Sequence, residues 1–271
     1  MSSFTVGLPL IHTKTTILYY NNRNKKRLCA DVVCAAPSFA VMKKYSVLLA
    51  DLDNTLLDFT ASERSALGRL FGHFGIECGE DVFSDYASFN VGLWERLERG
   101  ELTRKQLIDT RFVEFFRYEN IDADGHAAKT LYERFLSEGA FKTDGADELF
   151  ERCRGKIRIY IISNGTMAVQ LPRLAASGFD RLSDGCFISE MVGYNKPDRR
   201  FFEYVRDNVP GFNKEETLVL GDSLTADIDG GARFGLDTCL FDRNGSYDGS
   251  GAVRPDMVID RLTDIFGILG V

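Results

Sequence analysis

Two aspartates, Asp51 and Asp53, stand one residue apart at the end of an apolar run in the stretch YSVLLADLDNTLLDF (45–59). A carboxylate at the end of a buried strand is destabilising unless something pairs with it or uses it. The preceding run, from Tyr45 to Ala50, is short, apolar and partly β-branched, which favours a buried parallel strand. Because strand side chains alternate, both carboxylates can project the same way, where they repel each other unless a cation or a shared proton lies between them.

Similar residue types follow other apolar runs of the chain. In open α/β sheets, ligands bind beyond the carboxyl ends of the strands, so residues that follow several strands can meet at one edge. Each such residue alone is a common helix cap or turn residue. Four acids, hydroxyl groups and one lysine at the same edge indicate a site for phosphate and a divalent metal, and hard oxygen ligands suit Mg²⁺. The set at these positions is Asp51, Asp53, Thr55, Ser163-Asn164-Gly165, Lys196, Asp222 and Asp227.

The hydrophobic pattern predicts the elements that must position these residues. Between residues 59 and 141, apolar residues recur at helical spacing in four segments, and TRKQ (103–106) fits a capping box at the start of the third. Pro172 predicts a kink or a helix start in MAVQLPRLAASG, because proline costs ~3 kcal/mol inside a helix. Elsewhere apolar runs alternate with helical segments, which predicts a parallel α/β sheet with helices on both faces. The predicted strands are 45–50, 156–165, 217–223, 238–243 and 256–260.

Four short segments, DLDNT, SNG, NKP and GDSLTAD, resemble in order and spacing the four motifs of the haloacid dehalogenase superfamily of phosphohydrolases. The resemblance extends from Met42 to about Leu269. It implies an α/β fold with a Rossmann-like parallel-sheet core (42–58 and 142–271) and an inserted four-helix-bundle cap domain (59–141), the architecture that the periodicity also predicts. Dehalogenating members lack an acid at the position of Asp53, so this residue favours phosphate chemistry.

The resemblance also implies catalytic and metal-binding roles. Asp51 is the expected nucleophile that attacks phosphorus and forms an aspartyl-phosphate. Asp53 is expected to protonate the leaving oxygen and then to activate the water that hydrolyses this intermediate. The expected Mg²⁺ ligands are Asp51, the backbone carbonyl of Asp53, Asp222 and, in or just behind that shell, Asp227.

Further residues are expected to bind the phosphate group. The resemblance implies that Ser163 and the amide of Asn164 hold phosphate oxygens and that Lys196 neutralises them, while Thr55 braces the loop. Phosphoryl transfer requires in-line positioning and neutralisation of charge, which this set of residues can supply together with magnesium.

Substrate choice is expected to reside in the inserted helices. Asn90 and Arg111 interrupt apolar stripes, and Trp94 follows Asn90 on the same predicted helix. The segment 89–112 and ISEMVGYNKPDRRFFEYV resemble the branch of pyrimidine nucleoside 5′-monophosphate phosphatases, which also cleave non-standard pyrimidine nucleotides in a pool-cleaning role. These three residues are therefore candidate substrate-binding residues. The alternative is that they are structural residues of the bundle.

Three functions stay open on the sequence alone. The first is a magnesium-dependent 5′-nucleotidase in nucleotide metabolism, and the second is a phosphatase of small metabolites such as phosphoglycolate or sugar phosphates. The third is a non-catalytic phospho-acceptor or regulatory protein, which would not need Asp53 as an acid and base. A sugar-phosphate mutase would also keep the core, but it needs a cap that lets its bound intermediate turn around.

Charge and composition limit the classes of molecule that the protein is expected to bind. The chain of 271 residues has a net charge of −7, and residues 1–41 carry five Lys or Arg residues against one Asp, so the remainder is strongly acidic. This balance argues against nucleic-acid binding, and no apolar stretch reaches the ~18 residues of a membrane span. The six cysteines are scattered and form no CxxC pair, which favours reduced thiols in a cytoplasmic protein. A small phosphate ester is thus the expected partner, and the oligomeric state is left open.

The first 41 residues differ from the rest of the chain. They are basic and polar, with broken apolar patches and no sustained period, and Met42 stands just before the first predicted strand. We favour a start assigned too far upstream, with a disordered tail or a targeting segment as the alternatives.

Overall fold

The computed structural model describes residues 17–21, 26–30, 45–77 and 79–271. The chain divides into two units, residues 1–43 and 44–271. In the first unit, strands β1 (Ile17–Asn21) and β2 (Lys26–Ala30) pair antiparallel, an element that the sequence pattern did not predict. The other residues of the expected tail lie outside the described ranges, so the origin of this segment stays a prediction. No helix in the described ranges is long and apolar enough to span a membrane.

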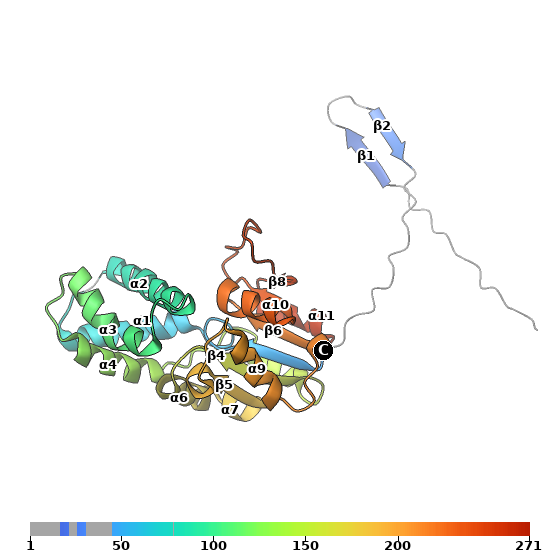
Figure 1. Cartoon of the computed structure of the whole chain (residues 1–271). Helices are drawn as coiled ribbons and strands as arrows, with labels where there is room; N and C mark the ends of the chain where they lie inside the picture. The colour runs from blue at the N-terminus through green and yellow to red at the C-terminus, as the bar shows by residue number, and fades with distance from the viewer. Residues whose placement is uncertain (1–16, 22–25, 31–44, 78) are drawn as a thin grey trace, which may run out of the picture. The chain divides into compact units, whose positions relative to one another are not determined.

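A six-stranded parallel sheet forms the centre of the second unit, in the order β5-β4-β3-β6-β7-β8 (Figure 1). The chain runs from β3 outward to β4 and β5, then crosses to the other side and continues through β6. The strand order therefore reverses at β3, where open α/β sheets form their ligand crevice. The predicted α/β fold is confirmed. The strands are β3 (Val47–Asp51), β4 (Arg158–Ser163), β5 (Gly185–Ile188), β6 (Thr217–Gly221), β7 (Asp237–Phe241) and β8 (Met257–Ile259).

Strand β5 is the one member of this sheet that the sequence did not predict. It has four residues, begins with a glycine and buries only Ile188 fully. It lies at the edge of the sheet and pairs with β4 alone. Edge strands are often short and lack the continuous apolar run of a central strand, so the pattern carries little signal.

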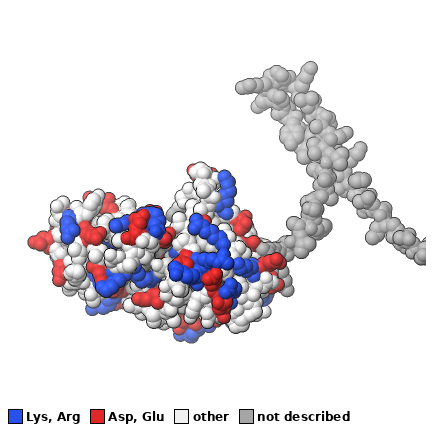
Figure 2. Space-filling view, viewed as in Figure 1, with Lys and Arg blue, Asp and Glu red and all other residues white. Residues whose placement is uncertain are grey.

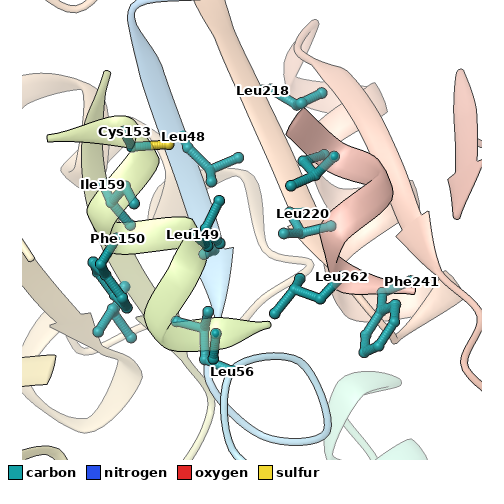
Figure 3. Packing of buried hydrophobic residues seen from close by; sticks show 14 of the residues in the cluster. Leu48, Leu56, Leu149, Phe150, Cys153, Ile159, Leu218, Leu220, Phe241 and Leu262 are labelled. Carbon is teal, nitrogen blue, oxygen red and sulfur yellow. The ribbon is translucent and has the colours of Figure 1, made fainter. Parts of the chain in front are cut away.

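The sheet is buried on both faces, as alternation along β3 shows. Leu48 and Ala50 join a cluster with helix α5, whereas Val47 and Leu49 join a second cluster with helix α9. Figure 3 shows the first cluster, with Leu48 and Leu218 from adjacent strands facing helical side chains such as Leu149. This double burial fixes the strand ends rigidly in place. The helices of the core are α5 (Ala146–Cys153), α6 (Met167–Ser177), α7 (Phe179–Leu182), α8 (Ser189–Val192), α9 (Arg199–Asn208), α10 (Gly230–Phe234) and α11 (Ile265–Leu269), with short turns at η1 (Lys214–Glu216) and η3 (Leu262–Asp264) and a π-helix, η2 (Leu224–Asp229).

Four helices follow β3 and pack around an aromatic core of their own. Tyr86 stacks on Phe112 with ring centroids 5.2 Å apart and meets Phe115 edge-on at 5.0 Å. The predicted capping box is present, because Thr103 and Gln106 exchange their side-chain and backbone hydrogen bonds at the start of α3. The helices are α1 (Phe59–Phe74), α2 (Glu80–Glu98), α3 (Arg104–Tyr118) and α4 (Gly125–Ser137), hereafter the helical bundle. Its role as a cap domain stays a prediction. Basic and acidic side chains are interspersed on the visible face of this unit (Figure 2).

Helix α6 corrects one expectation. It begins at Met167 and contains Pro172 in its interior, so the prediction that a helix starts at this proline is wrong. The Glu190 carboxylate accepts a 2.6 Å hydrogen bond from the Met167 backbone N–H and so stabilises the start of the helix. Burial of side chains on both sides of the proline, among them Val169 and Leu174, offsets the lost backbone hydrogen bond.

Candidate active site

A cavity of about 430 Å³ opens where the carboxyl ends of β3, β4 and β6 meet the helical bundle. Its wall combines charged residues of the strand ends with residues of α1, α2, α3 and α6. Most of the predicted site residues lie on this wall, whereas Thr55 and Ser163 do not. The predicted residues on the wall are Asp51, Asp53, Asn90, Trp94, Arg111, Asn164, Lys196, Asp222 and Asp227.

Three carboxylates gather around one ammonium group at the core side of the cavity. Lys196 Nζ lies 2.6 Å from Asp51 Oδ1 and 2.6 Å from Asp227 Oδ1. Asp51, Asp222 and Asp227 each offer an oxygen within 4.8 Å of the others. One lysine cannot balance three carboxylates, and buried charge without a partner is strongly unfavourable. The donor set is all oxygen and carries excess negative charge, so it fits a divalent cation such as Mg²⁺.

The protonation equilibria reflect this crowding. Burial raises the pKa of Asp51 well above its ordinary value, Lys196 opposes the rise, and Asp227 and Asp222 add to it. Burial also raises the pKa of Asp222 to about 7, and the negative charge of Asp227 contributes. Burial alone would lower the pKa of Lys196, but the adjacent Asp227 and Asp51 carboxylates raise it above its ordinary value. The lysine is therefore charged, and the raised pKa values of Asp51 and Asp222 reflect an excess of carboxylates over positive charge at this site.

Backbone geometry brings Asp227 into this cluster. A Cβ atom at Gly221 would lie 2.2 Å from Asp227 Oδ2, so only glycine allows the carboxylate to approach the strand end. The Ser223 backbone N–H donates to the same oxygen at 3.2 Å. Asp227 itself lies within the π-helix η2, a rare element that often occurs at functional sites.

Asn164 holds the backbone of Lys196 in place. Its side-chain oxygen accepts from the Lys196 N–H at 2.8 Å, and its amide group donates to the Lys196 carbonyl at 2.9 Å. The loop that carries the lysine is thereby tied to the end of β4. Because Lys196 Nζ also donates to the Ile162 carbonyl at 3.3 Å, the ammonium has a fixed position beside Asp51.

Asp53 faces a different group of partners from Asp51. Gln170 Nε2 donates to Asp53 Oδ2 at 2.5 Å, and Arg173 Nη1 donates to Asp53 Oδ1. Ser163 lies beneath the cavity surface, where its hydroxyl accepts from Gln170 Nε2 at 2.8 Å and from the Gly165 N–H at 3.1 Å. The Thr55 hydroxyl is buried without a hydrogen-bond partner among the described residues, and its expected role in bracing the loop stays a prediction.

A conserved-domain comparison identifies the family. The description of the matching family is haloacid dehalogenase-like hydrolase, and the match covers residues 45–235. The chain belongs to the haloacid dehalogenase-like hydrolases. The match includes both regions named above, the strand-end cluster and the helical bundle, and it agrees with the resemblance found in the four motifs.

Several curated proteins resemble this hydrolase along most of its length. YfnB of Bacillus subtilis, described as a HAD-hydrolase, is 38% identical over 85% of this chain and 97% of its own length. The pyrimidine 5′-nucleotidase PynA of Streptococcus pneumoniae is 37% identical over 73% of this chain and 84% of its own. The pyrimidine 5′-nucleotidase YjjG of Escherichia coli is 28% identical over 83% and 98%, respectively. A crystal structure of YfnB bound to magnesium matches with a TM-score of 0.80 over 84% of this chain and 100% of that one.

The bundle side of this hydrolase's cavity carries a second polar cluster. Glu63 Oε1 accepts from Asn90 Nδ2 at 2.8 Å and from the Tyr132 hydroxyl at 2.9 Å. Arg111 Nη1 donates to Asn90 Oδ1 at 3.1 Å, and its guanidinium lies 4.7 Å from the centre of the Tyr132 ring. Trp94 is half-buried and belongs to the adjoining apolar cluster. Asn90 and Arg111 are thus part of the bundle interior and also line the cavity.

Hydrogen bonds of Arg104 and of Glu98 join the helical bundle to the core near the cavity. Arg104 Nη1 donates to the Gly165 carbonyl at 2.6 Å, and Nη2 donates to Ser189 Oγ and Asn195 Oδ1. Thr225 and Glu98 both line the cavity, and the Thr225 hydroxyl donates to Glu98 Oε2 at 2.6 Å. These contacts connect α2 and α3 to loops that follow β4, β5 and β6.

Sequence reasoning missed Glu63, Arg104, Gln170 and Arg173. Gln170 and Arg173 stand three residues apart in an otherwise apolar helical segment, a spacing that places both on one face and could have drawn notice. Glu63 lies near the start of α1, after the Asp58 cap, where glutamate is unremarkable in sequence. Its importance comes only from long-range partners on α2 and α4.

Proposed function

We propose that this hydrolase is a magnesium-dependent phosphomonoesterase that cleaves pyrimidine nucleoside 5′-monophosphates, including non-canonical ones, to nucleoside and phosphate. The observation that carries the proposal is the single cavity that joins the strand-end carboxylates to the polar and aromatic wall of the helical bundle. The relatives PynA and YjjG, both pyrimidine 5′-nucleotidases, support the same substrate class. A volume of about 430 Å³ is within the range of small-molecule sites.

The strand-end geometry supports the proposed chemical step. Asp51 attacks the phosphorus atom, the bond to the leaving oxygen breaks, and an acyl phosphate, the aspartyl-phosphate, forms on the aspartate. Asp53 gives a proton to the leaving oxygen and then takes one from the water that hydrolyses the aspartyl-phosphate. Lys196, which lies 2.6 Å from Asp51, neutralises charge at the point where the dianionic substrate meets a carboxylate.

Magnesium fits the same group of residues. Asp51, Asp222, Asp227 and the backbone carbonyl of Asp53 would hold it, and it would supply positive charge that lowers the repulsion between phosphate and nucleophile. The magnesium-bound structure of YfnB supports this choice of metal.

The bundle wall suits the leaving nucleoside. Trp94 offers an aromatic surface and Asn90 an amide, while Arg111 Nε is buried with no hydrogen-bond partner among the residues that the structure describes. A buried donor without a partner at a cavity wall suits a ligand acceptor, and the carbonyl oxygens of a pyrimidine ring are acceptors. A planar base between an aromatic ring and these donors would be recognised by stacking and hydrogen bonding.

A phosphatase screen tests the proposal. The purified chain is assayed with Mg²⁺ against pyrimidine and purine nucleoside 5′-monophosphates, phosphoglycolate and hexose phosphates, and released phosphate is measured. We expect the highest kcat/KM with pyrimidine nucleotides such as dUMP and dTMP. A clear preference for phosphoglycolate or a hexose phosphate would assign the chain to small-metabolite phosphatases, and no turnover of any ester would contradict the phosphatase proposal itself.

A further inference from the structure

Arg173 occupies an unusual place for a charged side chain. It is completely buried on α6, and it makes an ion pair with Asp53. Its Nε donates to the Gly139 carbonyl at 2.8 Å, and its Nη1 donates to Gln170 Oε1 at 2.8 Å as well as to Asp53. A buried guanidinium costs several kcal/mol of desolvation, so the arrangement calls for a role beyond packing.

Gln170 also donates a hydrogen bond to the Asp53 carboxylate. Its Nε2 donates to Asp53 Oδ2 at 2.5 Å and to Ser163 Oγ at 2.8 Å. Asp53 therefore has a donor on each carboxylate oxygen, Arg173 on one and Gln170 on the other. With both oxygens engaged, the carboxyl group cannot rotate freely, and each oxygen keeps a lone pair for a proton or a substrate.

The Gly139 carbonyl connects these hydrogen bonds to the helical bundle. Gly139 lies where the chain returns from α4 to the core, and its carbonyl also accepts from Ser62 Oγ of α1 at 3.2 Å. A Cβ atom at Gly139 would lie 2.9 Å from Ser62 Cβ, so the two segments are in close contact. Arg173 donates hydrogen bonds to both the Gly139 carbonyl and the Asp53 carboxylate. It therefore links the segment that returns from the helical bundle to Asp53.

We propose that Arg173 and Gln170 are positioning residues that hold the Asp53 carboxyl group in the orientation for proton transfer and tie that orientation to the return segment of the helical bundle. This inference rests on the proposed phosphatase function, in which Asp53 is the acid and base. Neither residue needs to touch the substrate, because both act through Asp53.

The proposal predicts a dependence on the leaving group. When Asp51 attacks an alkyl phosphate, the phosphorus–oxygen bond breaks toward an alkoxide, and a proton from Asp53 must reach that oxygen in the transition state. A p-nitrophenolate anion leaves without a proton. Because kcat/KM covers only the steps through departure of the leaving group, misorientation of Asp53 should lower kcat/KM for alkyl esters and spare p-nitrophenyl phosphate.

The experiment compares Gln170→Leu, Arg173→Lys and Arg173→Met with the wild-type chain. The substrates are the alkyl phosphate that the wild-type chain cleaves best and p-nitrophenyl phosphate. We expect kcat/KM for the alkyl ester to fall about 10- to 100-fold in Gln170→Leu and Arg173→Met, part of the 10²–10⁴ of general acid catalysis. Arg173→Lys should retain more activity than Arg173→Met, and p-nitrophenyl phosphate should lose less than about threefold, with the alkyl-ester loss in kcat rather than KM.

Ser177→Ala is the matched control, because Ser177 is a buried polar residue of the same helix that donates to the Leu174 carbonyl and does not contact Asp53. It should leave the ratio of the two substrates unchanged. Equal losses on both substrates, or an unchanged ratio in Gln170→Leu, would overturn the proposal. If Arg173→Met does not fold, Gln170→Leu still decides it, and a wild-type chain that cleaves neither ester contradicts the proposed function instead.

Discussion

The two buried polar clusters of this hydrolase differ in their balance of charge. At the strand ends, three carboxylates share one lysine, and the oxygens of Asp51, Asp222 and Asp227 lie within 4.8 Å of one another. In the helical bundle, one carboxylate, Glu63, is matched by one guanidinium, Arg111, and by hydrogen bonds from neutral side chains. The first cluster is incomplete without a cation, whereas the second is nearly complete within the protein.

This difference in charge suggests that the two sides of the cavity have different roles. An excess of buried negative charge is costly, and such clusters are typical of sites that bind a cation or carry out chemistry. A balanced cluster, in which Arg111 Nε has no hydrogen-bond partner among the described residues, has little use for a charged ligand. It suits a neutral group with one or two acceptors. The core is thus suited to chemistry and the bundle to recognition of the part of the substrate that leaves.

The largest expected effect comes from the nucleophile. Asp51→Asn should abolish turnover, because an amide cannot form the phosphorylated intermediate, while the nearly identical shape should preserve the fold. Phosphate release and circular dichroism measure the two properties. Asp180→Asn, an exposed aspartate on α7, is the control. Retention of more than about a tenth of the wild-type kcat, a deficit of under ~1.4 kcal/mol, would show that Asp51 is not the nucleophile.

Removal of the metal should lower activity about as strongly as Asp51→Asn. It acts on the strand-end carboxylates and leaves the helical bundle unchanged. Activity should vanish in EDTA and return with Mg²⁺, whereas Ca²⁺ should replace it poorly because its longer and looser coordination misplaces the reacting groups. Mg²⁺ should also raise the Tm of the wild-type chain by preferential binding to the folded state, and Asp222→Asn should reduce that rise. Full activity in the presence of chelator would contradict the metal site.

The bundle should show a smaller and more selective effect. Trp94→Ala and Arg111→Ala should lower kcat/KM for pyrimidine nucleotides by ~1–3 kcal/mol, the range for losing a stacked or paired base. Hydrolysis of p-nitrophenyl phosphate should change little, since this small ester barely needs the bundle. Arg117→Ala, at an exposed position of the same helix α3, is the control. Equal losses on both substrates would mean that these residues only hold the bundle together.

The strand-end cluster and the bundle cluster also differ in how much of each could be predicted from the sequence. Strand-end residues such as Asp51 and Asp222 follow apolar runs at recognisable spacing, so parallel topology alone brings them to one edge. Bundle residues such as Asn90 and Arg111 could be placed on helices, but their shared partner could not be found. Glu63 reaches Tyr132 across 69 residues of sequence, and such a contact depends on how the helices pack. Arg173 was missed for the same reason, because Asp53 lies 120 residues away.

The last expected effect concerns stability and leaves the strand-end cluster unchanged, so it tests the balanced cluster of the helical bundle alone. Burial raises the pKa of Glu63 to about 7 from an ordinary value of 4.5, although the Tyr132 hydroxyl, the charge of Arg111 and the Asn90 amide favour ionisation. The folded state therefore binds more protons than the unfolded state between these two pH values. The contribution of Glu63 to stability must then fall as the pH rises from about 4.5 to 7 and stay constant above that.

Glu63→Gln removes this dependence while keeping an oxygen that can accept from Asn90 and Tyr132. The free energy of unfolding of the variant, relative to the wild-type chain, should increase by up to about 3 kcal/mol between pH 5 and pH 8. Urea unfolding at several pH values in that window measures it, and Glu151→Gln, at an exposed position of α5, should show a much smaller change. A constant difference across the window would mean that Glu63 ionises as readily in the bundle as in water, and that the bundle cluster is as solvated as a surface ion pair.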